Sequence, residues 1–174
     1  MKIRTATPSD RVEIERIHRD AFDESEGPVV AKLAVDLLAD EAAQPASAFL
    51  AEEEGGVVGC IVFSPITLRG QDTVRCAILA PLAVASDFQR RGIGRALIRH
   101  GLVAMESQGV DLVLVYGDPS YYSRFGFTPH HHVIAPYELQ YPDAWMAYEI
   151  TPGRIGNAGG IAECAAALRH PQYW

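Results

Sequence analysis

The sequence predicts one α+β domain, a mixed α/β architecture with a central, mostly antiparallel sheet of six or seven strands flanked by helices. Three observations lead to this class. Two segments near the N-terminus carry apolar residues at helical spacing. A Gly-Gly turn then separates two strand-like segments. Farther along, residues 79–116 follow the order strand, polar turn, helix and strand. No repeat, low-complexity tract or linker divides residues 1–174.

The composition narrows the function classes. The chain has 174 residues, of which 48% are hydrophobic and 21% charged, with a formal net charge of −7. This acidic balance argues against a nucleic-acid backbone as a general partner. No run reaches the roughly 18 apolar residues of a membrane span, and no signal-peptide pattern opens the chain. Cys60, Cys76 and Cys164 are odd in number and widely spaced. We therefore expect free thiols, no metal site, no membrane partner and a cytoplasmic location.

The first residues predict a strand over 3–6 followed by a helix. Thr7 suits the N-cap of this helix, Pro8 its first turn, and Asp10 the last position of a capping box. Apolar residues recur through the helix at the spacing of one buried face. His18 lies within it, and we expect this side chain at the surface or boundary rather than in a catalytic site.

An acidic break over residues 23–28 precedes a second helix, which runs to Asp40. The break is either a solvated loop or a surface that receives a cationic amine. Two strands are expected over 48–53 and 57–63, joined by the Gly-Gly turn. Pro65 is expected to end or bend the second of these strands.

An arginine-rich turn follows a long apolar strand pattern at Val74–Val84. Pro81 predicts a bulge in that strand, because proline has no N–H for the ladder. The turn, Gln-Arg-Arg-Gly-Ile-Gly-Arg at 89–95, opens a helix. Unpaired N–H groups, the helix dipole and the arginines together favour an anion such as a pyrophosphate.

Three alternatives compete with the pyrophosphate site. The simplest is an ordinary strand–turn–helix corner with solvated arginines. A dinucleotide fingerprint is disfavoured, because Leu97 holds the third glycine position and Asp111 opens a strand instead of closing one. A Walker A loop is excluded, because no Gly-Lys-Ser/Thr follows.

The remaining elements are less regular. Residues 111–116 predict a strand covered on both faces, and 119–125 a short helix. The three histidines at 130–132 suggest a solvated loop rather than a metal site, because successive side chains on extended backbone point to opposite faces. A strand is expected over 144–150, whereas residues 161–174 fit a helix or a strand equally well.

Two motifs in series resemble the GNAT superfamily, the acyl-CoA-dependent N-acyltransferases. The first, Gln-Arg-Arg-Gly-Ile-Gly at 89–94, matches the Gln/Arg-x-x-Gly-x-Gly/Ala pyrophosphate loop of that family. The second, Tyr-Tyr-Ser-Arg-Phe-Gly-Phe at 121–127, looks like its Tyr-x-x-x-Gly-Phe ending. The resemblance covers most of the chain, to about Ile150. Residues 118–127 look like a branch of the family with the motif Asp-Pro-x-Tyr-Tyr-x-Arg-Phe-Gly-Phe. In the commoner family pattern an asparagine opens this region, and this chain has no clear match at that position.

The resemblance implies a GNAT-like fold in which a splayed strand pair forms the coenzyme cleft. It implies an N-acetyltransferase domain over 1–174, with a motif-bearing core over about 3–150 and a C-terminal extension over 151–174. Acetyl-CoA is the implied co-substrate, without a metal. Its pantetheine arm would lie along Leu82, Ala83 and Val84, and its pyrophosphate would bind the loop formed by Gln89, Arg90, Arg91, Gly92, Ile93, Gly94 and Arg95.

The implied reaction moves an acetyl group from acetyl-CoA to a primary amine by direct attack in a ternary complex. Tyr122 matches the position that donates to the leaving thiolate, and a backbone N–H near Val84 would polarise the acyl carbonyl. The general base stays open among Glu24, Glu26, Asp87 and Asp118, and a water chain could serve instead. The acceptor is a small-molecule or peptide amine of undetermined identity, and a homodimer is left open. A non-catalytic acyl-CoA-binding or sensing module is the second hypothesis, and a nucleotide-binding or hydride-transfer domain the third.

Overall fold

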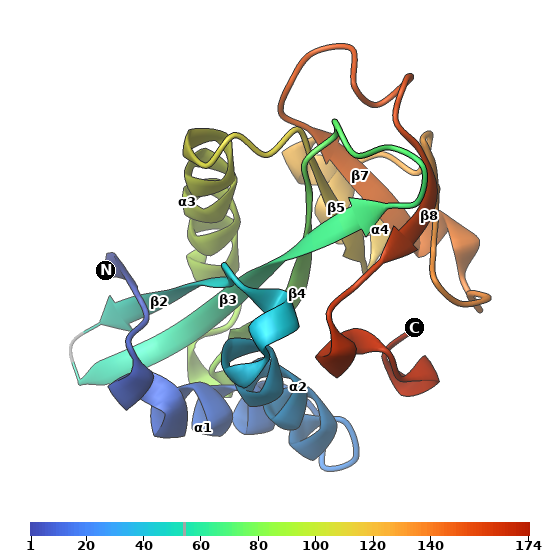
Figure 1. The fold of residues 1–174 in the computed structure, drawn as a ribbon. Helices are drawn as coiled ribbons and strands as arrows, with labels where there is room; N and C mark the ends of the chain where they lie inside the picture. The colour runs from blue at the N-terminus through green and yellow to red at the C-terminus, as the bar shows by residue number, and fades with distance from the viewer. Residues whose placement is uncertain (54) are drawn as a thin grey trace.

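An open sheet with helices on both faces organises the molecule, as the ribbon in Figure 1 shows. The computed structural model describes residues 1–53 and 55–174. The main path of the sheet has the order β1-β2-β3-β4-β5-β7, and β8 joins it by pairing with β3 and β6. The strands are β1 Lys2–Thr5, β2 Ser47–Glu53, β3 Gly56–Leu68, β4 Cys76–Val84, β5 Leu112–Tyr116, β6 His132–Ile134, β7 Trp145–Glu149 and β8 Gly159–Glu163.

Most neighbouring strands are antiparallel, and the parallel pairs are β4 with β5 and β6 with β8. The four α-helices are α1 Arg11–Ala21, α2 Gly27–Ala39, α3 Ile93–Ser107 and α4 Pro119–Tyr122. The predicted α+β class and mostly antiparallel sheet are therefore confirmed. Short 3₁₀ turns lie at Pro8–Asp10, Glu41–Ala43, Ser86–Phe88, Ser123–Phe125, Pro142–Ala144, Ala166–Leu168 and Pro171–Tyr173. Across residues 1–53 and 55–174, we find no helix with the length and apolarity that crossing a bilayer requires.

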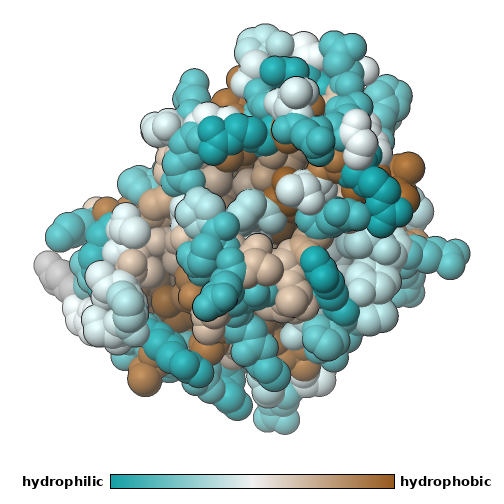
Figure 2. Space-filling model, in the orientation of Figure 1, coloured by the Kyte–Doolittle hydropathy of each residue, from teal (hydrophilic) through white to brown (hydrophobic). Residues whose placement is uncertain are grey.

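Each face of the sheet carries its own apolar core. On β5, Leu112 and Leu114 pack into the core beneath α1 and α2, whereas Val113 and Val115 pack into the core beneath α3. This alternation confirms that β5 is covered on both faces. Figure 2 shows hydrophilic residues over much of one face of the molecule, with apolar atoms gathered toward its centre.

The N-terminal corner forms as its sequence predicts. The N–H of Thr7 donates to the Asp10 carboxylate at 2.7 Å, and the N–H of Asp10 donates to the carbonyl of Thr7 at 3.0 Å. The Arg4 guanidinium adds two bonds to the same carboxylate, at 2.8 and 2.7 Å. These bonds, those from Arg4 foremost, hold the pKa of Asp10 well below its ordinary range. The turn therefore links β1 to the start of α1.

The surface position expected for His18 is wrong. This side chain is fully buried, because it lies one turn after Ile14 on the apolar face of α1. Its Nδ1 lies 2.8 Å from the carbonyl oxygen of Ile14, and its Nε2 has no partner in residues 1–53 or 55–174. Burial lowers the pKa of His18 to about 4, so the ring is neutral at pH 7.

The end of β3 also differs from the prediction, since the strand continues through Pro65 to Leu68. Pro65 pairs in register with Ala77 of β4. On the other side of β3, pairing with β2 ends at Phe63 and pairing with β8 begins at Thr67. Pro65 therefore lies where neither β2 nor β8 requires a ladder N–H from it, which is how a central strand tolerates proline.

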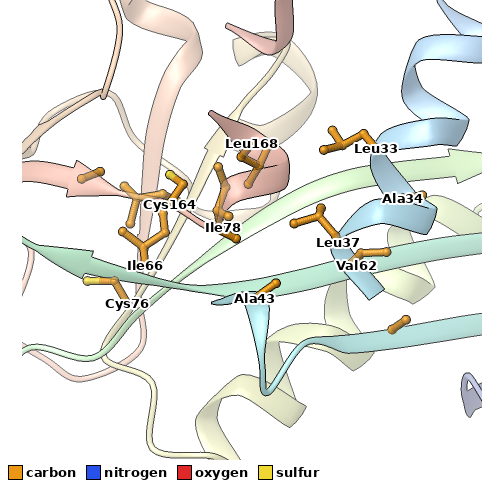
Figure 3. Packing of buried hydrophobic residues seen from close by; sticks show 14 of the residues in the cluster. Leu33, Ala34, Leu37, Ala43, Val62, Ile66, Cys76, Ile78, Cys164 and Leu168 are labelled. Carbon is orange, nitrogen blue, oxygen red and sulfur yellow. The ribbon is translucent and has the colours of Figure 1, made fainter. Parts of the chain in front are cut away.

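The C-terminal residues combine both structures that the sequence left open. After β8, two 3₁₀ turns bring the chain back beside α2 (Figure 1). Figure 3 shows Leu168 and Cys164 in the same apolar cluster as Leu33 and Leu37 of α2. The N–H of Ala167 donates to the Asp40 carboxylate at 3.0 Å. Residues 151–174 thus complete the core on this face.

The histidine segment is only partly the solvated loop that was expected. His130 and His132 are exposed, and His132 begins β6. His131 is half-buried, with Nε2 2.9 Å from the carbonyl oxygen of Trp145 and Nδ1 accepting from the N–H of Val133 at 3.2 Å. In the described ranges no group of three His, Cys, Asp or Glu side chains is placed to hold a metal ion.

Candidate active site

A β-bulge interrupts the pairing of β3 with β4. Ile61 pairs with Leu82 and Phe63 pairs with Leu79, so Ala80 and Pro81 together oppose a single residue of β3. The bulge predicted at Pro81 is therefore confirmed. Its physical origin is the missing N–H of proline, which cannot contribute to a regular ladder.

The strands β4 and β5 separate at the same level. Their parallel pairing ends at Ile78 and Leu114, although β4 continues to Val84. The N–H of Ala85 donates to β3, at 2.9 Å from the carbonyl oxygen of Val58. Since backbone groups alternate along a strand, the N–H of Val84 faces away from β3, toward the open edge. The second half of β4 therefore presents backbone groups that no neighbouring strand uses.

The arginine turn lies next to this open edge. The Gln89 side-chain amide donates to the carbonyl oxygens of Val84 at 3.1 Å and Ala21 at 3.2 Å, which fixes the turn to β4 and α1. Arg90 and Gly92 are left-handed, with φ of 60° and 84°. Glycine suits that conformation because it has no Cβ, and Gly92 caps α3.

Free amides and positive charge coincide at the start of α3. The first intrahelical bond runs from the N–H of Ala96 to the carbonyl of Gly92 at 3.0 Å, so the amides of the three preceding residues have no intrahelical partner. Ile93 turns its side chain into the core, so only its backbone is available to a ligand. Arg90, Arg91 and Arg95 are exposed, and none forms an ion pair within the described part of the chain.

The two tyrosines of α4 point to different parts of this region. The hydroxyl of half-buried Tyr121 lies 2.6 Å from where a Cβ on Gly94 would be, so it covers the arginine turn. Tyr122 is 9% exposed and packs its ring against Gly117 and Phe127. Burial raises the pKa of Tyr122 above its ordinary value. Its hydroxyl has no hydrogen-bond partner in the chain as described, and its side chain lines the cavity beside β4.

That cavity has a volume of about 1040 Å³. Its lining comes from the α1–α2 connection and α2, the bulged part of β4, the end of β5 with α4, residues 140–144 and residues 172–174. Leu82 lies in this lining, whereas Ala83 is buried and, like Val84, is absent from it. The segments 140–144 and 172–174 were missed as site residues, because no motif or charge pattern marks them in the sequence.

The acidic residues considered as general bases separate into two groups. Glu26 and Asp118 line the cavity, whereas Glu24 and Asp87 are absent from its lining. The Asp118 carboxylate accepts from the side chain of Ser120 at 2.9 Å and from its N–H at 2.8 Å. These bonds hold the pKa of Asp118 below its ordinary value, which makes it a weak base.

The three cysteines are buried and free, as the sequence predicts. Burial raises the pKa of Cys76 and of Cys164 to about 12, and raises that of Cys60 as well. Thiols with such pKa values hold their protons at pH 7 and are poor nucleophiles. None of the three lines the cavity.

A family model described as an acetyltransferase (GNAT) domain matches residues 2–130. This chain belongs to the GNAT acetyltransferase family. Its Escherichia coli (strain K12) relative YjhQ, named an uncharacterized N-acetyltransferase, is 38% identical over 163 residues, which cover 90% of this chain and 88% of YjhQ. YhbS of the same organism, also named an uncharacterized N-acetyltransferase, is 32% identical and covers 94% of this chain and 95% of YhbS.

Solved GNAT structures agree with the fold. The crystal structure of Escherichia coli YhbS in complex with CoA has a TM-score of 0.86 and 28% identity, covering 97% of this chain and 92% of that one. A GNAT family acetyltransferase from Brucella melitensis in complex with acetyl-CoA has a TM-score of 0.74 and 27% identity, covering 95% and 96% of the two chains. The GNAT fold expected from the motifs is therefore confirmed.

Proposed function

We propose that this GNAT protein transfers an acetyl group from acetyl-CoA to a primary amine by direct attack in a ternary complex. The observation that carries the proposal is the open edge of β4, which lies between the arginine turn and the cavity. An extended pantetheine arm suits this edge, because it can pair with unused backbone groups as an added strand does. The CoA and acetyl-CoA complexes of the two structural relatives support the choice of coenzyme.

The coenzyme would be held at two places. Its pyrophosphate would accept hydrogen bonds from the free amides at the start of α3, with the exposed arginines adding positive potential. Its pantetheine arm would follow Leu82, Ala83 and Val84 toward the cavity. The anchoring of Gln89 to Val84 keeps these two places in fixed relation.

The chemical step needs a polarised thioester. As the amine nitrogen attacks the carbonyl carbon, negative charge develops on the carbonyl oxygen, and the N–H of Val84 is the donor we assign to it. The tetrahedral intermediate then expels the CoA thiolate and forms the amide. The proton that the amine must lose passes to Glu26, which lines the cavity and whose carboxylate accepts no hydrogen bond from the described residues.

Tyr122 is the residue we assign to the leaving thiolate. Because its pKa is raised by burial, its hydroxyl stays protonated at neutral pH and can stabilise the thiolate as a hydrogen-bond donor. Tyr122→Phe removes this donor while keeping the ring that packs on Phe127. We expect kcat to fall by roughly tenfold or more with little change in acetyl-CoA affinity. A variant with unchanged kcat would exclude Tyr122 from this role.

Acetyl-CoA titration by calorimetry and thiol release with a panel of amines test the whole proposal. Arg90→Gly is the sharpest loop variant, because glycine keeps the left-handed backbone while the charge is lost. We expect severalfold weaker acetyl-CoA binding at low salt, whereas Lys32→Gln on α2 should leave it unchanged. Acetyl-CoA binding without thiol release from any amine would favour a non-catalytic sensing module. No binding at millimolar acetyl-CoA would exclude both functions.

A further inference from the structure

We infer that the acceptor site selects amines that have an apolar, preferably aromatic, body and carry no carboxylate or phosphate. The inference rests on the proposed acetyl transfer and concerns the part of the cavity beyond the bulge of β4. It comes from the charges and aromatic side chains that four separate segments of the chain bring to one cavity.

The charged side chains in the cavity lining are all acidic. They are Glu26, Asp118 and Asp143, and no Lys, Arg or His from residues 1–53 or 55–174 lines the cavity with them. An ammonium group is attracted to this field, whereas an anionic group on the acceptor meets like charges and no cation to pair with. The lining therefore discriminates against amino acids and phosphorylated amines.

Aromatic side chains form a wall of the cavity. Tyr116 at the end of β5 stacks on Trp174, with ring centroids 6.4 Å apart and an interplanar angle of 25°. Both residues line the cavity, together with Tyr141 and Tyr173. Aromatic faces bind apolar rings because both bury apolar surface. They also attract ammonium groups through cation–π interactions. This wall suits an amine whose body is flat and apolar.

Hydrogen bonds hold the wall in place. The hydroxyl of Tyr116 accepts from the N–H of Tyr141 at 3.3 Å, which ties residues 140–144 to β5. The indole N–H of Trp174 donates to the carbonyl of Leu168 at 2.9 Å. These bonds, and that between Asp40 and Ala167, place the C-terminal residues against the cavity before any acceptor binds.

Tyr122, which we assign to the leaving thiolate, also indicates that polar ligand atoms enter this cavity. It is nine-tenths buried, it lines the cavity, and its hydroxyl has no hydrogen-bond partner in the chain as described. Because the chain offers this hydroxyl no partner, water or a ligand group in the cavity must supply its hydrogen bond. The acidic side chains and the aromatic wall line the same cavity as this hydroxyl.

Matched amines test the inference by binding, separately from catalysis. Phenethylamine and phenylalanine differ by one carboxylate, and phenethylamine and ethylamine differ by the ring. Calorimetry with the CoA-loaded full chain should show phenethylamine binding at least about tenfold tighter than either of the others. Asp143→Asn should narrow the ratio between the dissociation constants of phenylalanine and phenethylamine severalfold. Trp174→Ala should narrow the ratio between the dissociation constants of ethylamine and phenethylamine. Glu24→Gln, in the same acidic break but outside the lining, should leave both ratios unchanged.

The outcomes separate this inference from the proposed function. Phenylalanine binding as tightly as phenethylamine, or no phenethylamine binding at 10 mM to protein that binds CoA, overturns the inference alone. Protein that binds no CoA overturns the proposed function on which the inference rests. Ratios that change equally in Asp143→Asn and Glu24→Gln would show that net charge, and not the cavity, discriminates between the amines.

Discussion

Lowering the pH from 7 to 5 should destabilise this protein, mainly through His18. The ring is fully buried on α1, where burial lowers its pKa from 6.5 to about 4. The folded state therefore keeps the ring neutral, whereas the unfolded chain binds a proton as the pH falls through 6.5. The stability that the neutral ring contributes is fully present above pH 6.5, and it is lost as the pH falls toward 4.

The size of the effect follows from the two pKa values. Linkage between a folded pKa of about 4 and an unfolded pKa of 6.5 gives a loss of about 2 kcal/mol between pH 7 and pH 5. The total reaches about 3 kcal/mol below pH 4. Carboxylates contribute little in this window, because they are ionised in both states above pH 5. His131, whose pKa burial also lowers, adds a contribution of the same sign.

Urea unfolding at pH 7 and pH 5 measures the loss, and His18→Leu isolates it. Leucine fills similar space, and the Ile14 carbonyl that faces Nδ1 also belongs to the helix ladder. Between pH 7 and pH 5, the free energy of unfolding of the variant should fall by about 2 kcal/mol less than that of the natural chain. The fall that remains in the variant should come from His131. An equal loss in the variant and the natural chain would refute the argument, as would no loss in the natural chain.

Two further substitutions test the packing on which the site rests. Gly101→Ala on α3 would place a methyl group against the ring of Phe63, and overpacking of about 1–3 kcal/mol should outweigh the helix propensity gain of about 1 kcal/mol. Denaturant unfolding should show lower stability, and a more stable variant would mean that the ring moves aside freely. Asp10→Asn removes the ionic acceptor of Arg4 and should cost about 1–3 kcal/mol at pH 7. Because the pKa of Asp10 is lowered in the fold, the natural chain should also lose stability as the pH falls below about 4, and the variant should show less of this loss.

The sequence predicts well the elements whose causes are local. Thr7 and Asp10 mark a helix start because their bonds lie within four residues. Pro81 marks the bulge because a proline within the paired part of β4 has no N–H to give to the ladder. The position of the arginine turn at the start of α3 likewise follows from the order of a strand, a glycine and an amphipathic helix.

Features that depend on distant partners could not be predicted in the same way. His18 was misplaced because its polarity outweighed its spacing from Ile14, although that spacing was the better guide. Pro65 was misread because β3 changes partners there, from β2 to β8, and the change is invisible in the sequence of β3. The strand β8 was ambiguous because its pairing with β3 and β6, and not its own pattern, makes it a strand.

This division between local and distant causes coincides with the two halves of the proposed site. The coenzyme half is formed by the bulge, the arginine turn and a helix start, all within residues 79–96, and the bond from Gln89 to Ala21 fixes it to α1. The acceptor half is assembled from the α1–α2 connection, residues 140–144 and residues 172–174, which are held by contacts between distant segments, such as that of Tyr141 with Tyr116. Substitutions in those segments can reshape the acceptor pocket without altering the backbone of the coenzyme site. Acceptor preference should therefore change through these segments while acetyl-CoA binding stays constant.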